Sequence, residues 1–360
     1  MFDFFRSAAD NLGTSHFWQL SYVVWGLILL ALTFDFLNGL HDAANSIATV
    51  VSTRVLSPFQ AVIWAAFFNF AAFIVFPLHV AATITKEVVD QSLITDPYIA
   101  NRLIAATLIA ACGWNVFTWL LGLPTSSSHA LIGGMVGAAI AIRGNFDSIH
   151  GEGLSLIVGF IFLAPLFGMI LGSAIGIAVM WLFRRSSPLG VDNLFRRGQL
   201  LSAALFSLGH GGNDAQKTMG VILVLLIGAS AGGANFPTPK QVPTEVVLAC
   251  HVAMGVGTMF GGWRIVKTMG QRIIRLRPVD GFCAETGAAI TLGFTTIVGG
   301  IPISTTHTIT GAIVGVGSLK RKRAVRWAVA GQVIWAWILT IPGAALLAAI
   351  SAEILYLLGG

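Results

Sequence analysis

Charged residues are scarce in this sequence. Asp, Glu, Lys and Arg make up 10% of its 360 residues, whereas hydrophobic residues make up 56%. A chain of this composition cannot bury its apolar side chains in one core and still present a polar surface to water, which excludes a soluble globular protein. It predicts an all-α polytopic membrane protein, because helices satisfy their own backbone hydrogen bonds within a bilayer.

Two other classes are excluded by what the sequence lacks. Cys112, Cys250 and Cys283 stand alone in apolar surroundings, without the close spacings of disulfide frameworks or zinc sites. The formal net charge is +6, but Lys and Arg occur in short clusters between apolar runs. Orientation in a membrane explains such clusters better than binding to nucleic acid, so we expect a lipid bilayer and no nucleic acid as partner.

The sequence repeats itself. The stretch "GLPTSSSHALIGGMVG" from Gly122 recurs as "GIPISTTHTITGAIVG" from Gly300, an offset of 178 residues, and "HDAANSIAT" from His41 recurs as "NDAQKTMGV" from Asn213, an offset of 172. The same order of motifs in two halves indicates a duplication. We expect a first transmembrane repeat over residues 1–183, a basic cytoplasmic linker over 184–198 and a second, inverted transmembrane repeat over 199–360.

Several apolar runs are longer than one membrane crossing, which needs about 20 helical residues. The runs span residues 17–51, 59–82, 103–142, 153–183, 199–230, 243–263, 281–318 and 327–358. We predict that 103–142 and 281–318 fold back at their Pro-hydroxyl-His motifs as two re-entrant hairpins. A pair of full crossings would also return the chain to its starting side.

Charges beside the two hairpins predict opposite orientations in the membrane. Residues 86–102 and 143–152 carry charges of both signs, whereas 264–277 and 320–326 carry basic residues only. By the positive-inside rule, the second hairpin enters from the cytoplasm and the first from outside. Three crossings plus one hairpin in each half then give an inverted-topology repeat with broken helices, the plan of secondary transporters, whose substrate sites lie near the midplane.

The hairpin motifs place hydroxyl groups where we expect helices to begin. Pro124 and Pro302 suit a first helical turn. Free backbone amides, hydroxyl donors and the positive end of the helix dipole together make an anion site, and two such ends facing each other suit a tetrahedral oxyanion. The predicted hydroxyls are Ser126, Ser127, Ser128, Ser304, Thr305 and Thr306. The alternative is that they only cap or pack the helices.

Acidic residues occur inside apolar runs, where carboxylates are costly and usually functional. We expect helices to break at "FDFLNGLHDAANSIAT" and "FSLGHGGNDAQKTMG" and to present Asp42 and Asp214 to a coupling cation. Three residues further on, Asn45 and Lys217 lie on the same helix faces and could contact the substrate. Lys217 could instead form an ion pair with Asp214 that only supports the fold. Glu285 is a third acid, for which functional and structural roles are equally open.

Other polar residues in the motifs are weaker candidates. His129 and His307 follow the hydroxyls directly and are either structural residues or titrating groups. Asp35 and Asn38 lie near the first acidic motif.

At these residues the sequence resembles the inorganic phosphate transporter (PiT) family, over nearly the whole chain and in both copies of both motifs. The resemblance implies phosphate symport by alternating access, with the hairpin hydroxyls holding phosphate and the Asp motifs serving the coupling cation. Besides the hydroxyls, the predicted substrate-binding residues are Asn45, Gln216 and Lys217. The predicted coupling-ion residues are His41, Asp42, Asn213, Asp214 and Glu285.

The departures from the family pattern are His41, where many members have Asn, and Gln216 with Lys217. These versions resemble the bacterial low-affinity branch, which is associated with protons and with neutral metal-phosphate complexes. We therefore expect a proton-coupled phosphate importer of the bacterial inner membrane, with no cofactor, that could carry phosphate with a divalent metal and could form a homo-oligomer. Sodium as the coupling cation and sulfate as the substrate are the alternatives.

The sequence bears on two other classes of function. An intramembrane hydrolase could use Ser127 with His129, but residues two apart on a helix do not face each other, and no acid lies beside them to orient the histidine. We therefore expect no enzyme. A channel is also conceivable, and counter-transport of labelled phosphate against a gradient distinguishes a carrier from it.

Overall fold

The computed structural model describes residues 20–81, 83, 93, 95–231, 241–320 and 324–359, and every regular element in these ranges is helical. Six helices are long and apolar enough to cross a membrane: α2 (Tyr22–Ser52), α5 (Pro97–Leu121), α7 (Gly151–Leu182), α8 (Pro188–Ala231), α11 (Pro278–Phe294) with its continuation η5 (Thr295–Gly299), and α13 (Trp327–Leu357). Large apolar side chains such as Phe162, Trp335 and Leu339 are exposed on α7 and α13. The prediction of an all-α integral membrane protein is confirmed.

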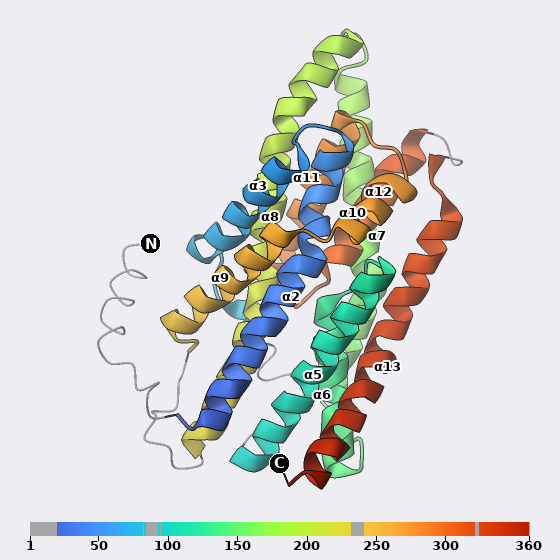
Figure 1. The fold of residues 1–360 in the computed structure, drawn as a ribbon. Helices are drawn as coiled ribbons and strands as arrows, with labels where there is room; N and C mark the ends of the chain where they lie inside the picture. Colours follow the sequence, from blue (N-terminus) through green and yellow to red (C-terminus); the bar gives the residue numbers. More distant parts are fainter. Residues whose placement is uncertain are drawn as a thin grey trace.

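The helices pack reciprocally between the two halves of the chain. The shorter elements are α3 (Pro58–Ala71), η2 (Ala72–Ile74), α6 (Ser127–Arg143), α9 (Thr244–Phe260), α10 (Trp263–Lys267), η4 (Thr268–Arg272) and α12 (Thr305–Lys320). Helix α6 packs against α13 and α12 against α7, just as α2 packs against α9 and α8 against α3. Figure 1 shows α5 and α6 in the lower half of the view and α11 and α12 in the upper half. The orientation of each half in the bilayer stays a prediction.

Glycines let α6 and α12 approach their neighbours closely. A β-carbon at Gly133 of α6 would overlap the backbone of Ile341 in α13. At the equivalent position of the other half, a β-carbon at Gly311 of α12 would overlap the backbone of Pro165 in α7. Small residues at such contacts allow van der Waals packing between backbones, which stabilises helix pairs in lipid. Both hairpin arms are therefore held against a long helix of the opposite half.

The helices do not break at the acidic motifs, so that prediction is wrong. Helix α2 is continuous through residues 39–45, and α8 is continuous through residues 209–217. The glycines in these motifs serve packing instead, because a β-carbon at Gly39 would overlap the Met254 carbonyl group and one at Gly211 would overlap that of Asn69. A glycine inside a membrane helix permits close approach of a neighbour without interrupting the helix.

The hairpins turn at the Pro-hydroxyl-His motifs, but the prolines do not start helices as predicted. Gly122 and Gly300 end the first arms with φ of 66° and 57°, a left-handed conformation that suits glycine. Pro124 is then the centre of a three-residue turn in which Thr125 N donates to Leu123 O at 3.0 Å, and the backbone N–H of residue 303 donates to residue 301 in the same way at 2.9 Å. The fixed φ of proline matches this turn.

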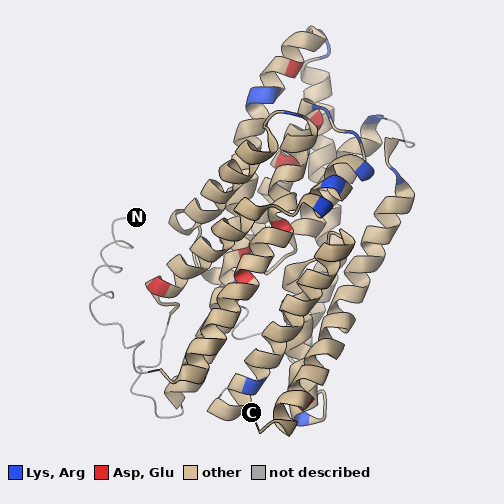
Figure 2. Cartoon of the chain, viewed as in Figure 1, with Lys and Arg blue, Asp and Glu red and all other residues tan. Residues whose placement is uncertain are grey.

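The basic segment between the halves is mostly helical. Helix α8 begins at Pro188, so residues 188–198 of the expected linker form its first turns. Figure 2 shows Lys and Arg concentrated towards the upper end of the view and several acidic residues midway along the helices. The charges at 86–90 and 321–323 that entered the prediction of orientation lie outside the described residues.

Candidate functional site

The N-termini of α6 and α12 carry equivalent caps. Ser126 Oγ accepts a hydrogen bond from the backbone N–H of His129 at 3.2 Å, and Ser304 Oγ accepts one from His307 at 3.2 Å. The rings of His129 and His307 contact each other with centroids 4.8 Å apart. The two helix N-termini, with their backbone N–H groups and positive dipole ends, therefore meet inside the protein.

Hydroxyl and amide groups from both halves gather at this meeting point. Asn45 Nδ2 of α2 donates to Thr306 Oγ1 at 2.9 Å and to Thr305 Oγ1 at 3.3 Å. Thr305 Oγ1 donates to Asp214 Oδ2 at 3.1 Å. Ser127 Oγ and Asn45 Oδ1 are buried and have no hydrogen-bond partner within the described part of the chain. These atoms are available to a bound solute.

Asp214 is surrounded by donors. Lys217 Nζ lies 2.5 Å from Oδ1, and Asn213 Nδ2 donates to the same oxygen at 3.0 Å. His210 Nε2 lies 3.2 Å from Oδ2. Lys217 also donates to Ser128 Oγ at 2.5 Å. The side chain of Asp214 is 1% exposed, so this carboxylate depends on these groups for compensation of its charge.

Asp42 has a different environment. His41 Nδ1 lies 2.7 Å from Asp42 Oδ1, and the other ring nitrogen of His41 lies 3.1 Å from Thr118 Oγ1. Asp42, His210 and Asp214 each place one ligand atom within 4.8 Å of the others, so this buried group of two carboxylates and one imidazole could hold a cation. The predicted acids of α2 and α8 are thus brought together.

Glu285 lies apart from this group. Its carboxylate accepts hydrogen bonds from the hydroxyls of Thr49 and Ser202 and, at 3.2 Å, from Gln199 Nε2. Thr49 is seven residues, about two helical turns, after Asp42 on α2. Glu285 therefore contacts the same face of α2 as Asp42, about two helical turns further along.

Gln216 is not gathered with the hydroxyls. Its amide oxygen accepts from the backbone of Val80 at 3.0 Å and Ala81 at 3.4 Å, and its amide nitrogen donates to Pro77 O at 2.8 Å. The side chain therefore fastens residues 77–81 to α8 in this structure.

Some residues of the site were not singled out from the sequence. His210 precedes Asp214 by four residues, one helical turn, and this spacing is the signal that could have identified it. Thr118 and Thr125, whose hydroxyls lie 3.0 Å apart beside His41, gave no such signal. Asp35, a weaker candidate, is fully buried on α2, and its carboxylate oxygens have no hydrogen-bond partner within the described residues.

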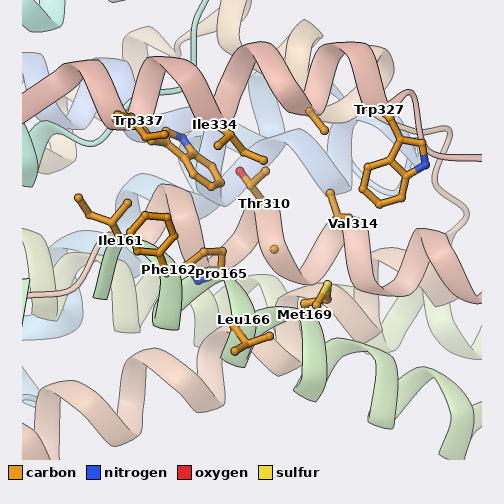
Figure 3. Close-up of a pocket in the computed structure, with 13 residues that line it drawn as sticks. Ile161, Phe162, Pro165, Leu166, Met169, Thr310, Val314, Trp327, Ile334 and Trp337 are labelled. Atoms are coloured by element: carbon orange, nitrogen blue, oxygen red, sulfur yellow. The ribbon is translucent and has the colours of Figure 1, made fainter. Parts of the chain in front are cut away.

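An apolar cavity of about 290 Å³ lies between α7, α12 and α13, and its lining includes Trp337, whose ring stacks on that of His307. Figure 3 shows Pro165, Thr310, Trp327 and Trp337 around it. Its lining contains no charged residue. An anion would lose its hydration there without gaining charge or enough donors, so this cavity is not a site for the predicted oxyanion.

Comparison with known proteins connects this arrangement with one family. The model of the "Phosphate transporter family" matches residues 38–191 and 184–348. The chain is 55% identical over 325 residues to a "probable low-affinity inorganic phosphate transporter" of Rhizobium meliloti, covering 90% of this chain and 94% of the relative. A protein of Bacillus subtilis with the same description is 43% identical over 330 residues, with coverage of 91% and 96%.

A solved structure has the same fold. The structure described as "the sodium-dependent phosphate transporter" superposes with a TM-score of 0.83, over 94% of this chain and the whole of that one. Its sequence identity to this chain is 24%, so the likeness establishes the shared fold.

Proposed function

This chain belongs to the phosphate transporter family, and we propose that it imports inorganic phosphate across the bacterial plasma membrane by symport with a cation. Phosphate is the transported substrate of the family, and the matched relatives are transporters, not enzymes. The description of those relatives as low-affinity transporters supports the same property in this chain.

One observation carries the proposal: two capped helix N-termini meet beside a buried group of acids. Phosphate oxygens would accept hydrogen bonds from Ser127, Thr305, Thr306 and the backbone N–H groups of α6 and α12, as anions do at helix N-termini. Asn45 already donates to two of these hydroxyls and would orient them. Donors from both halves would therefore surround one tetrahedral anion.

The acids beside this site give a reason for coupling. A phosphate anion that enters a buried site near Asp42 and Asp214 is repelled by their negative charge, and this repulsion is strong where water is excluded. A cation bound at Asp42 removes part of the repulsion. The protein therefore binds phosphate more tightly when the cation is bound, and the cation more tightly when phosphate is bound. We propose a proton as this cation because His41 and His210 adjoin the two carboxylates.

Transport by alternating access would use the two hairpins. The first hairpin, α5 and α6, occupies the lower half of the view in Figure 1, and the second, α11 and α12, the upper half. We propose that the first hairpin withdraws to admit solute from outside and that the second withdraws to release it into the cytoplasm. Such motion would keep the polar turn backbone in a cavity or in protein, as a bilayer requires.

Uptake by purified protein in proteoliposomes tests the proposal. A proton gradient imposed without sodium should drive phosphate accumulation, and a sodium gradient at equal pH should not. Accumulation driven by sodium alone would establish the sodium-coupled alternative, and inhibition by sulfate would identify a less selective oxyanion carrier. Loss of uptake on removal of divalent metals, restored by adding them, would show that phosphate crosses as a metal complex.

A further inference from the structure

The Lys217 side chain extends into the centre of the molecule and is 2% exposed. Its Nζ atom lies 2.5 Å from Asp214 Oδ1, 2.5 Å from Ser128 Oγ and 2.9 Å from Ile303 O. An ammonium group has three N–H donors and no acceptor, so these contacts use all three. In this arrangement Lys217 has no donor left for a substrate anion. It joins Asp214 to the turns of both hairpins.

The first half makes the equivalent contact with a neutral side chain. The offset of 172 residues pairs Asn45 with Lys217, and the offset of 178 pairs Thr306 with Ser128. Asn45 Nδ2 donates to Thr306 Oγ1 at 2.9 Å, as Lys217 Nζ donates to Ser128 Oγ. In each half, the residue three positions after the aspartate therefore donates to the last of the three adjacent hydroxyl residues in the hairpin of the other half. The contacts correspond, but only the second half supplies a positive charge through this side chain.

Because of this asymmetry, the carboxylates of Asp42 and Asp214 have different charged neighbours. A buried carboxylate without a compensating cation is costly, and both Asp42 and Asp214 are buried. Asp214 has the ammonium of Lys217 at 2.5 Å, whereas Asp42 has the imidazole of His41 at 2.7 Å and, in place of an ammonium, the amide of Asn45. The two acids of the repeat thus have unequal need of a cation from solution.

We infer that Lys217 is a resident cation, fixed in the second half at the place where the first half takes a dissolved coupling cation. The inference rests on the proposed function and specifies its coupling. One exchangeable cation, held at Asp42, crosses with phosphate, and the charge of Asp214 is neutralised by the protein itself.

The contacts of Lys217 indicate what its removal would leave. Asp214 Oδ1, Ser128 Oγ and Ile303 O are all oxygen atoms that converge on one point. Small hard cations prefer oxygen ligands. A neutral, shorter side chain at position 217 should therefore open a site for sodium or lithium.

Thermal unfolding of the purified protein without phosphate tests this directly. Lys217→Asn gives the second half the residue of the first. Its melting temperature in choline chloride should fall below that of the protein with Lys217 in the same background, and sodium or lithium should raise it saturably by a few degrees, as binding to the folded state requires. Lys217→Arg, which keeps the charge, should show no such rise. The comparison is made in an Asp42→Asn background, so that cations held at Asp42 do not contribute.

Two outcomes would overturn the inference. One is equal melting of Lys217→Asn in choline and sodium. The other concerns the double variant Asp214→Asn/Lys217→Asn. Because it removes both charges, this variant is expected to be more stable in choline than Lys217→Asn alone. If it is not, Lys217 does not compensate Asp214, and this comparison holds even where the single variant is poorly folded. None of these measurements involves transport, so phosphate uptake by wild-type proteoliposomes tests the proposed function separately.

Discussion

The imidazole rings of His129 and His307, which occupy equivalent positions of the sequence repeat, lie with centroids 4.8 Å apart and planes inclined at 70°. Contact between equivalent residues places the junction of the two halves at this point. His307 also stacks on Trp337 with centroids 4.0 Å apart, and Trp337 Nε1 donates to Pro124 O of the other hairpin turn at 2.9 Å. Withdrawal of either hairpin must therefore separate aromatic contacts at the junction, so we expect these rings to stabilise the closed arrangement.

Removal of the hairpin hydroxyls should weaken phosphate binding. Ser127 Oγ has no partner within the described residues, so Ser127→Ala should leave the folded protein intact. A lost hydrogen bond to a charged group costs about 1.5–3 kcal/mol, or roughly one to two decades in affinity. Thr305→Ala should act similarly, with an added effect because Thr305 donates to Asp214.

The Michaelis constant for phosphate uptake measures this effect at matched expression. Ser155→Ala on α7 is the control, because its exposed hydroxyl donates only to its own helix at Glu152 O. Unchanged constants for both hairpin variants would leave their hydroxyls as helix caps or packing groups.

Neutral variants of the central acids should uncouple transport. Asp42→Asn and Asp214→Asn keep the side-chain shape but cannot carry a proton or hold a cation, so accumulation should be lost while exchange of phosphate without a gradient persists. Asp214→Asn should also lower stability, by about 3–5 kcal/mol, because it leaves Lys217 buried without its carboxylate. Uptake and counterflow in the same proteoliposomes distinguish the two activities. Full accumulation by either variant would remove that residue from the coupling.

Substitution at a close helix contact should destabilise the protein. Gly133→Ala places a methyl group against the Ile341 backbone, and such overpacking costs about 1–3 kcal/mol. Gly159→Ala on α7 is the matched control, because nothing lies within 4 Å of its added β-carbon. Thermal unfolding in detergent should show a lower melting temperature for the first variant only. Equal melting would show that α6 does not depend on its approach to α13.

The segments that flank the two hairpins should face opposite sides of the membrane. Asp147 and Arg272 are both exposed, so single cysteines at these positions should be accessible to reagents. In intact cells an impermeant thiol reagent should label position 147, whereas position 272 should react only after permeabilisation. Replacement of the three native cysteines supplies the background. Labelling of both positions from outside would contradict the inverted repeat.

The sequence alone predicted the membrane helices and the equivalence of the two halves. Apolar runs of sufficient length specify helices in lipid because a bilayer allows few other structures. Ser126 and Ser304 cap their helices, which the sequence offered as the alternative to substrate binding, because a cap depends on neighbouring residues only. The sequence also singled out Asp42 and Asp214 as candidates, since acids in apolar runs are conspicuous.

Only the tertiary structure decided what these residues contact. Gly39 could interrupt a helix or admit a neighbour, and packing against Met254 selects the second. Lys217 reaches Ser128, 89 residues away, and Glu285 accepts from Thr49, 236 residues away. Such partners depend on which helix faces meet, and a local pattern is compatible with several arrangements of helices. The sequence therefore determined which groups are costly in the membrane, and the fold determined which groups compensate them.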